Sequence, residues 1–262
     1  MSSHFPERII CLTEETTEII YLLNASEKIV GISGFTVRPP IARKTKPKVC
    51  TFIDADYQKI EMLKPDLILA FSDIQAEIAK ELIKRGFNVY TSNIRSVEDI
   101  LQNILIVGSL IGKQKSTERL VKTFEKKLTH TKKLSAKIKI KPKVFFEEWD
   151  QPLISCIRWV SELIEIAGGE EIFTELREKK LAKDRIVHPN EVIIRNPDII
   201  IGSWCGKGFK KEIVKGREGW SEINAVKNNL LFEIKSSIIL QPGPAALSEG
   251  LDNLIKILKN FN

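Results

Sequence analysis

The sequence predicts an α/β protein of two lobes, each with a mainly parallel sheet flanked by helices, joined by one long connecting helix. Strand-like and helix-like segments alternate along the 262 residues, as they do where helices connect parallel strands. One pattern, a short helix followed by Pro-Asp and a buried strand, occurs at residues 58–70 and again at 190–202. A segment free of Gly and Pro separates the two halves. We therefore expect an N-terminal lobe at 1–112, the connecting helix at 113–140 and a C-terminal lobe at 141–262.

Each element is expected from the spacing of its apolar residues. Short runs of Ile, Val and Leu are typical of strands covered on both faces, and apolar residues three or four positions apart are typical of helices. In chain order, strands are expected at 8–12, 28–32, 67–70, 88–91, 143–147, 199–202 and 230–234. Helices are expected at 14–23, 74–85, 97–111, 158–167 and 245–258, with the short helices of the repeated units beginning at 58 and 190. Pro65 and Pro197 end those short helices, because proline disfavours helical geometry in the residue before it.

The connecting helix is expected over residues 116–136, where Leu120, Phe124 and Leu128 recur at helical spacing. At a rise of ~1.5 Å per residue it would be roughly 30 Å long. Such a strut permits less hinge motion than a pair of flexible strands would.

Lysines between residues 113 and 143 carry much of the formal net charge of +7, which comes from 41 Lys and Arg against 34 Asp and Glu. We interpret them as the solvated side of a lysine-rich helix; the alternatives are a surface for nucleic acid or for an acidic membrane. No aromatic residue is interleaved with these lysines to stack bases, so nucleic acid is not expected as a partner.

The chain has the composition of an ordinary folded protein, with 43% hydrophobic and 29% charged residues. Residues 1–8 lack the basic start, apolar stretch and small-residue cleavage site of an export signal, which favours a cytoplasmic protein. A periplasmic location is the alternative, if a signal was removed. No apolar run approaches the ~20 residues needed to cross a bilayer, so the chain is not expected to span a membrane.

Catalytic and metal-binding motifs are not found. Cys11, Cys50, Cys156 and Cys205 are scattered singly, without the paired spacing of a zinc site, so we expect neither a metal nor a cofactor. The segment 108–114 departs from the phosphate-binding loop in both its spacing and its last residue. The glycine pattern of dinucleotide sites and the serine elbow of hydrolases are also missing from the sequence.

A ligand is expected at the carboxyl ends of the strands, because loops and helix N-termini converge there in parallel sheets. Trp149, Trp159 and Trp204 fall at such positions in the second half, where large flat side chains would offer contact area to a large planar ligand. The same loops carry polar and charged candidates: Glu14, Asp73, Glu148, Arg158, Lys207, Ser236 and Gln241.

Glu147, Glu148 and Asp150 could form a carboxylate pair for acid–base catalysis or supply oxygen ligands to a hard cation. No histidine lies near them in the sequence. We therefore favour hydrogen bonds from these acids to ligand amides or to helix N-termini, and we expect no catalytic residues and no enzymatic activity.

Several segments resemble a known family over nearly the whole chain. They are Arg8–Thr13 with Thr17–Ile19, Val30–Ser33, Lys64–Ile68, Glu162–Gly169 and Asn196–Ile200. Together they are similar to the substrate-binding proteins of ABC importers for cobalamin and ferric siderophores, in the class whose two lobes are joined by a long helix. Three further segments, Phe145–Trp149, Arg158–Leu163 and Val37–Pro40, resemble the cobalamin-binding branch.

This resemblance implies a monomeric, non-enzymatic protein that holds cobalamin or a related corrinoid or metal chelate in a cleft between the lobes, with an ABC permease as a possible partner. It adds four side chains to the expected ligand contacts: Phe35, Arg38, Phe52 and Phe71.

The sequence departs from the family at two expected permease-docking positions. Importer-coupled relatives typically carry a glutamate seven residues before each Pro-Asp proline, whereas this chain has Gln58 and Asn190 there. The neighbouring Glu61 and Glu191 could substitute. The departure keeps open an alternative, a cytoplasmic enzyme or metallochaperone that handles a corrinoid or metal chelate in the same cleft, with Cys205, Glu147 or Glu148 as its working groups.

Overall fold

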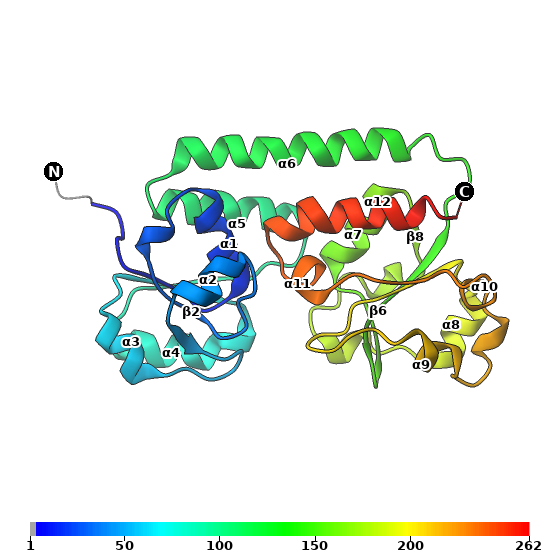
Figure 1. Ribbon diagram of the computed structural model, residues 1–262, viewed down its shortest axis with the longest axis horizontal. Coiled ribbons are helices and arrows are strands. Elements are labelled where there is room, and N and C mark those ends of the chain that lie inside the picture. Colours follow the sequence, from blue (N-terminus) through cyan, green and yellow to red (C-terminus); the bar gives the residue numbers. More distant parts are fainter. Residues whose placement is uncertain (1–3, 262) are drawn as a thin grey trace. The chain divides into compact units, whose positions relative to one another are not determined.

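The computed structural model describes residues 4–261, which fold into two compact units. Unit 1 contains the described residues up to Ile94 together with Glu98–Thr123, and unit 2 contains Arg95–Val97 and the described residues from Phe124 onward. The long helix α6, Gln114–Ser135, belongs to both units, and it confirms the helix expected at 116–136 (Figure 1).

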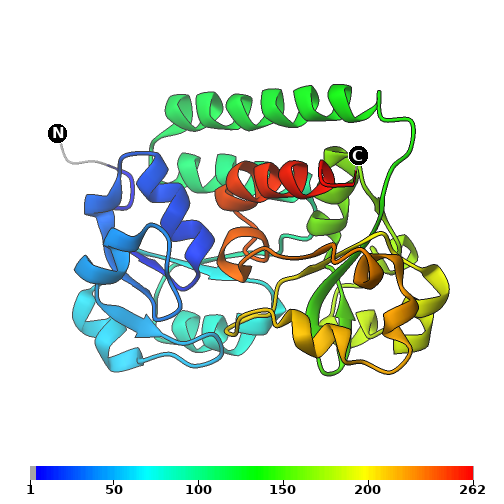
Figure 2. The same ribbon diagram turned by 45° about the vertical axis from the view of Figure 1, so that its right-hand side comes forward.

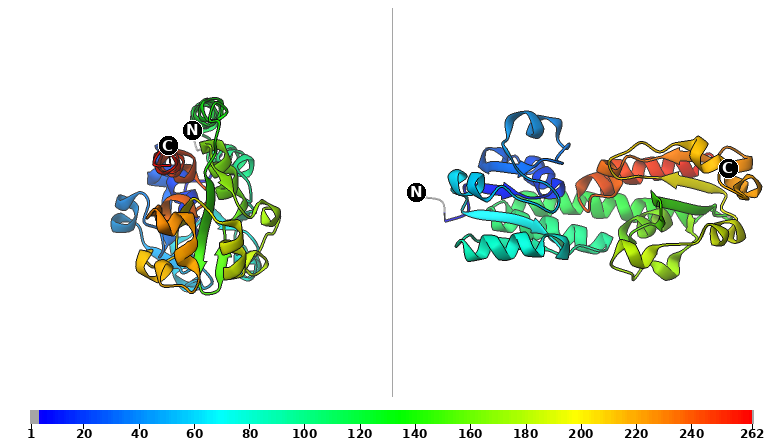
Figure 3. Two further views of the ribbon diagram at one scale, coloured as in Figure 1. Left: turned by 90° about the vertical axis from the view of Figure 1, so that its right-hand side faces the viewer. Right: turned by 90° about the horizontal axis from the view of Figure 1, so that it is seen from below.

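Among the described residues, unit 1 has one five-stranded parallel sheet in the order β3-β2-β1-β4-β5. Its strands are β1 (Ile9–Cys11), β2 (Ile29–Ser33), β3 (Lys48–Cys50), β4 (Leu67–Phe71) and β5 (Val89–Ser92). Its helices are α1 (Glu14–Leu22), α2 (Pro40–Thr45), α3 (Tyr57–Leu63), α4 (Ala76–Lys84) and α5 (Val97–Leu110). Figure 3 shows helices on both sides of this sheet. Buried aliphatic side chains, such as Ile10, Ile68 and Leu82, fill the space beneath them.

The sheet of unit 2 has the order β10-β9-β6-β7, and the short strand β8 (Glu170–Glu171) pairs with β6. The other strands are β6 (Lys143–Asp150), β7 (Leu153–Ser155), β9 (Ile199–Gly202) and β10 (Leu231–Glu233). Among the pairings between these strands in the described residues, only the β6–β7 hairpin is antiparallel, and an isolated antiparallel bridge joins Ile154 to Ile186. The helices that follow α6 are α7 (Arg158–Ala167), α8 (Pro189–Arg195), α9 (Lys211–Lys215), α10 (Asn224–Lys227), α11 (Ser236–Ile239) and α12 (Leu251–Leu258). In Figure 2, α12 lies alongside the second half of α6.

The strands and longer helices expected from the sequence are confirmed, with ends shifted by a few residues. The short elements α2, β3, β7, β8, α9, α10 and α11 were not expected, because two to six residues contain too little periodicity to be recognised. Strand β6 runs to Asp150 rather than ending at 147, because its last residues pair with β7. The helix expected at 245–258 begins with a π-helical turn at Ala246–Gly250.

The repeated Pro-Asp unit has the same role in both sheets. Before each proline, Lys64 and Asn196 adopt left-handed φ angles of 46° and 48°, which end α3 and α8. The aspartate after the proline then binds the backbone at the point where β1 or β6 begins. Asp66 accepts hydrogen bonds from the backbone N–H groups of Glu7 (2.7 Å) and Arg8 (3.0 Å). Asp198 accepts one from Lys143 (2.9 Å), so one sequence motif fixes the register of both sheets.

We expect Asp198→Ala to destabilise unit 2 by about 1–2 kcal/mol, because a charge-assisted hydrogen bond to the start of β6 is lost. Asp66→Ala should have a similar effect on unit 1. Denaturant titrations measure both. Asp252→Ala is the control, because its carboxylate is exposed on α12 and, among the described residues, pairs with the side chain of Lys127 alone. Equal effects of all three substitutions would contradict a special role for the Pro-Asp aspartates.

Candidate ligand-binding surfaces

In unit 1 the strand order reverses between β1 and β4, so the loops that follow these two strands diverge and leave the carboxyl edge of the sheet open. Gln75 ties the loops of this edge together. Its side chain is buried, accepts a hydrogen bond from Phe71 N (3.0 Å) and donates to Leu12 O (3.2 Å) and to Phe52 O (3.4 Å). Sequence reasoning missed this residue, which holds the ends of β1, β3 and β4 at fixed positions.

Exposed apolar side chains gather along the same loops. Phe35 is 59% exposed and Phe52 is 37% exposed, and their rings meet edge to face with centroids 6.5 Å apart. Further exposed apolar residues of these loops and of α2 are Val37, Ile41, Ile53 and Ile74. A cluster of this kind on a soluble protein marks a binding surface more often than a solvated one. Phe35 and Phe52 were expected ligand contacts, and both present their rings to solvent.

The charged residues expected at this edge are already engaged. Glu14 is buried, and one of its oxygens accepts a hydrogen bond from Val37 N (2.8 Å), while the other has no partner. Arg38 pairs with Glu18, with Nε and Oε1 3.2 Å apart. Burial of Glu14 removes it from the surface, so its role is to hold the loop that carries Phe35 and Arg38, not to meet a ligand.

The two remaining ligand contacts expected in unit 1 are Phe71 and Asp73, and only Asp73 is at the surface. Phe71 is buried in the last position of β4, which corrects its expected role as a ligand contact. Asp73, two residues further along, is exposed and accepts a hydrogen bond from Ser72 Oγ (2.6 Å).

Two adjacent buried acids at the start of α1 make unit 1 sensitive to pH. Burial raises the pKa of Glu14 and that of Glu15 to about 7. Because these pKa values are higher in the folded protein than in the unfolded chain, their contribution to stability is complete below about pH 4.5 and is lost as the pH rises through about 7.

We expect the free energy of unfolding of unit 1 to fall by about 2 kcal/mol between about pH 5 and pH 8 for each of these acids. Denaturant titrations across this range measure it, with Glu15→Gln as the variant whose profile should be flatter. Glu27→Gln, an exposed acid on the turn after α1, provides the control. An unchanged profile in Glu15→Gln would contradict the assignment.

In unit 2 the ends of β6 and β9 bring together three of the expected residues. Lys207 Nζ lies 4.2 Å from the centroid of the half-buried Trp149 ring and 5.0 Å from that of Trp204, and it pairs with Asp150 Oδ1 at 2.7 Å. Trp149 Nε1 donates to Gln151 O (2.8 Å), which fixes the plane of the indole. Trp149 and Lys207 therefore form a preorganised aromatic and cationic surface, which we call the Trp149 surface.

Trp204 and Trp159 are core residues, each only 2% exposed, which corrects the expectation that they meet a ligand. Trp204 packs edge to face on Phe209, with ring centroids 5.0 Å apart. A Cβ at Gly202 would lie 1.8 Å from the Phe209 ring, so glycine at the end of β9 is what admits this ring. Trp159 Nε1 donates to Ile239 O (2.9 Å) and thereby ties α7 to α11.

Glu147 and Glu148 are structural. Glu147 is fully buried, where its carboxylate forms a bidentate pair with Arg217, both N–O distances being 2.7 Å, and accepts a hydrogen bond from Trp204 Nε1 at 2.9 Å. Glu148 forms a bidentate pair with Arg185 (2.6 and 3.0 Å) and accepts a hydrogen bond from Ile157 N (3.1 Å), directly before α7. The expected hydrogen bond from these acids to a helix N-terminus is therefore present at Glu148. The sequence analysis did not predict Arg217 and Arg185 as the partners of these two acids.

The other expected contacts of unit 2 lie at the surface. Arg158 pairs with Glu162 (2.7 Å) and Glu178 (2.8 Å) at the start of α7. Ser236 begins α11 and Gln241 follows it, and both are half-buried. These two lie beyond the end of β10, as the sequence predicted.

The two expected docking positions lie on the short helices that precede the Pro-Asp motifs. Gln58 is in α3 and Asn190 is in α8. Asn190 lines a groove of about 1190 Å³ in unit 2, together with the β6–β7 turn and residues 217–220. Neither neighbouring acid is available without a change of partner. Glu61 pairs with Arg85 (2.6 Å), and Glu191 accepts a hydrogen bond from His188 N (3.1 Å) in the cap of α8.

Within residues 4–261, the structure contains no group of three or more His, Cys, Asp or Glu side chains arranged to hold a metal ion. Cys205 is exposed, and the other three cysteines are buried. In the same part of the chain, no helix has the length and apolar character required to cross a bilayer.

Known proteins resemble this chain over nearly all of its length. A family model described as periplasmic binding protein matches residues 9–238. An uncharacterized ABC transporter substrate-binding lipoprotein, YvrC, of Bacillus subtilis (strain 168) is 29% identical over 95% of this chain and 79% of its own length. A vitamin B12-binding protein of Vibrio vulnificus (strain YJ016) is 29% identical over 92% of this chain and 86% of its own.

Among solved structures, a possible iron-binding (periplasmic solute-binding) protein from Staphylococcus epidermidis ATCC 12228 superimposes with a TM-score of 0.81 at 26% identity. The match covers 96% of this chain and 98% of that one. The resemblance drawn from the sequence motifs is confirmed, and these relatives are substrate-binding proteins, not enzymes. Because the family model spans most of the chain and the relatives match more than 90% of it, this chain belongs to the periplasmic binding protein family and has a solute-binding role.

Proposed function

We propose that the solute is cobalamin or a related corrinoid, or another large planar metal chelate of that kind, and that the Trp149 surface is a principal contact. The observation that carries the proposal is the half-buried indole of Trp149, held between a backbone hydrogen bond and the Lys207 ammonium at the carboxyl edge of β6. A rigid aromatic face with a cation beside it suits a flat macrocycle whose side chains are amides and phosphate.

The exposed rings of Phe35 and Phe52 in unit 1 support the same ligand class. Both lie at the carboxyl edge of their sheet, where the parallel-sheet rule places ligands. The name of the vitamin B12-binding relative from Vibrio vulnificus adds a second, independent line of support.

Titration calorimetry tests the ligand class. Cyanocobalamin and cobinamide should bind with dissociation constants of about 10 µM or tighter, whereas a set of ferric siderophores should bind more weakly. Haemin is included as a planar chelate that lacks the corrinoid amides. A dissociation constant of tens of micromolar corresponds to a binding free energy of about −6 kcal/mol. If every one of these ligands binds more weakly than that, the ligand class is wrong.

The alternative of a metal-handling enzyme or metallochaperone is not favoured. Its expected working acids, Glu147 and Glu148, are committed to bidentate pairs with Arg217 and Arg185. A stoichiometric metal that is retained on purification and lost in Cys205→Ser would restore that reading.

We further propose that the protein delivers its solute to an ABC permease. Of the cytoplasmic and periplasmic locations that the sequence left open, we propose the one outside the cytoplasmic membrane. The names of the relatives, a substrate-binding lipoprotein and a periplasmic binding family, support this. The neutral side chains of Gln58 and Asn190 predict docking with little electrostatic steering. Stimulation of the ATPase of a reconstituted permease tests the partnership, and fractionation of cells tests the compartment.

A further inference from the structure

The second half of α6 and the loop after it form the most basic segment of the chain. Residues 126–143 contain eight lysines and no Asp or Glu, so the positive charge of this short segment exceeds the net charge of the whole chain, +7. The solute-binding role assigns no function to this segment, because it lies on the helices of unit 2 and not at the carboxyl edge of the sheet.

The lysines share a surface because α6 is buried along a narrow stripe. In unit 2 the buried positions of the helix are Phe124, Leu128, Thr131 and Ser135, at intervals of four, three and four residues. Lys126, His130, Lys133 and Lys137 follow one another at helical spacing on an exposed face. Among the described residues, Lys133 and Lys137 make no ion pair, whereas Lys127 on the flank pairs with Asp252 at 2.7 Å.

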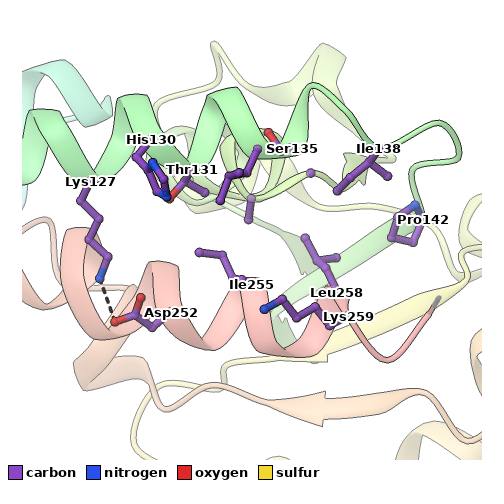
Figure 4. A pocket seen from close by; sticks show the side chains of 13 residues that line it. Lys127, His130, Thr131, Ser135, Ile138, Pro142, Asp252, Ile255, Leu258 and Lys259 are labelled. Atoms are coloured by element: carbon purple, nitrogen blue, oxygen red, sulfur yellow. Dashed lines mark hydrogen bonds and ion pairs between the residues drawn. The ribbon is translucent and has the colours of Figure 1, made fainter.

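Apolar groups stand among these charges. Leu134 is 53% exposed beside Lys133, and Ile140 is 71% exposed between Lys139 and Lys141. Leu134 also lines a pocket of unit 2. Figure 4 shows this pocket, where α6 faces α12. It has a volume of about 310 Å³, with apolar walls that include Ile138, Ile255 and Leu258, and Lys127, His130 and Lys259 around it.

We propose that this surface, the basic face formed by Lys133, Leu134, Lys137, Lys139, Ile140 and Lys141, docks the protein on an anionic phospholipid bilayer. Unpaired lysines gain attraction from anionic headgroups, and their flexible stems reach the phosphates while the ammonium groups stay hydrated. Leu134 and Ile140 then enter the boundary between headgroups and acyl chains. The helix lies on the bilayer without crossing it. The basic face contains no aromatic residue, which disfavours nucleic acid, since bases would find nothing to stack on.

Co-sedimentation of the full chain with lipid vesicles tests the proposal. Vesicles of phosphatidylcholine with about one third phosphatidylglycerol should bind the protein at low salt, and vesicles of phosphatidylcholine alone should not. Binding should be lost at about 0.5 M salt, where the charges are screened. The double variant Lys133→Ala, Lys137→Ala should bind about 25-fold more weakly, at about fivefold for each lysine. Leu134→Ser with Ile140→Ser should cost about tenfold.

The matched control is Lys179→Ala with Lys180→Ala, which removes the same charge from an exposed loop elsewhere in unit 2. Melting temperatures and ligand titrations on each variant verify that the fold and the solute site are intact. Equal losses in the control and in the Lys133, Lys137 variant would overturn the proposal, because net charge alone would then explain binding. Tighter binding to single-stranded DNA than to anionic vesicles would overturn it as well.

Discussion

Arg217→Ala should destabilise unit 2 by about 3–5 kcal/mol, because it leaves the carboxylate of Glu147 buried without a counter-charge. Glu147 is fully buried, and among the described residues the donor left to its carboxylate after the substitution is Trp204 Nε1. Guanidinium titrations measure the effect, following the unfolding of unit 2 for Arg217→Ala and of unit 1 for the control. Arg85→Ala is the control, since it breaks a comparable pair with Glu61 and Glu81 at an exposed position and should cost far less.

The double variant Glu147→Leu, Arg217→Met separates a missing counter-charge from missing packing. It removes both charges together, so it should recover a large part of the stability lost in Arg217→Ala. Recovery would show that the cost arises from the stranded carboxylate. If the double variant is as unstable as the single one, the contact of Arg217 with the Trp220 ring, 4.4 Å from guanidinium carbon to centroid, is the dominant interaction instead.

The sequence predicts the sheets well because their signals are local. The run Ile199–Gly202 follows Pro-Asp directly and contains three consecutive isoleucines, and these few residues suffice to place β9. The repeated Pro-Asp motif also corresponds to a hydrogen bond that occurs in both sheets. Asp66 and Asp198 bind the same point of their two sheets, so the repetition reflects one hydrogen-bonding requirement met twice.

The site could be predicted only in part. The neighbouring residues in the sequence do not indicate whether a side chain points inward or outward, or which distant residue it contacts. Trp149 lies near the end of β6 and Trp204 lies just after β9, yet only Trp149 keeps a face at the surface. Trp204 turns inward because Glu147, 57 positions away, accepts its N–H. Arg217 lies 70 positions from Glu147, and Gln75 lies 63 positions from Leu12. Nothing in the residues around these two side chains indicates that the fold would bring them to those partners.

Trp149→Ala should weaken cobalamin binding by about 100-fold, equivalent to about 2–3 kcal/mol, because a rigid aromatic contact with little entropy to lose is removed. Trp149→Phe should retain most of the affinity. Lys207→Met keeps the side-chain volume but removes the cation over the indole, and we expect about a tenfold loss for it. Calorimetric titration with cyanocobalamin measures all three variants.

Tyr57 provides a closely matched control for Trp149. It is also half-buried, and Arg85 lies over its ring at 4.8 Å, but it is on α3, away from the carboxyl edge of its sheet. Tyr57→Ala should therefore leave cobalamin affinity unchanged. If wild type binds cobalamin and Trp149→Ala binds equally well, the ligand class stands but the Trp149 surface is not its site. If wild type binds no corrinoid at all, the ligand class fails whatever the variants do, so the two proposals can be rejected separately.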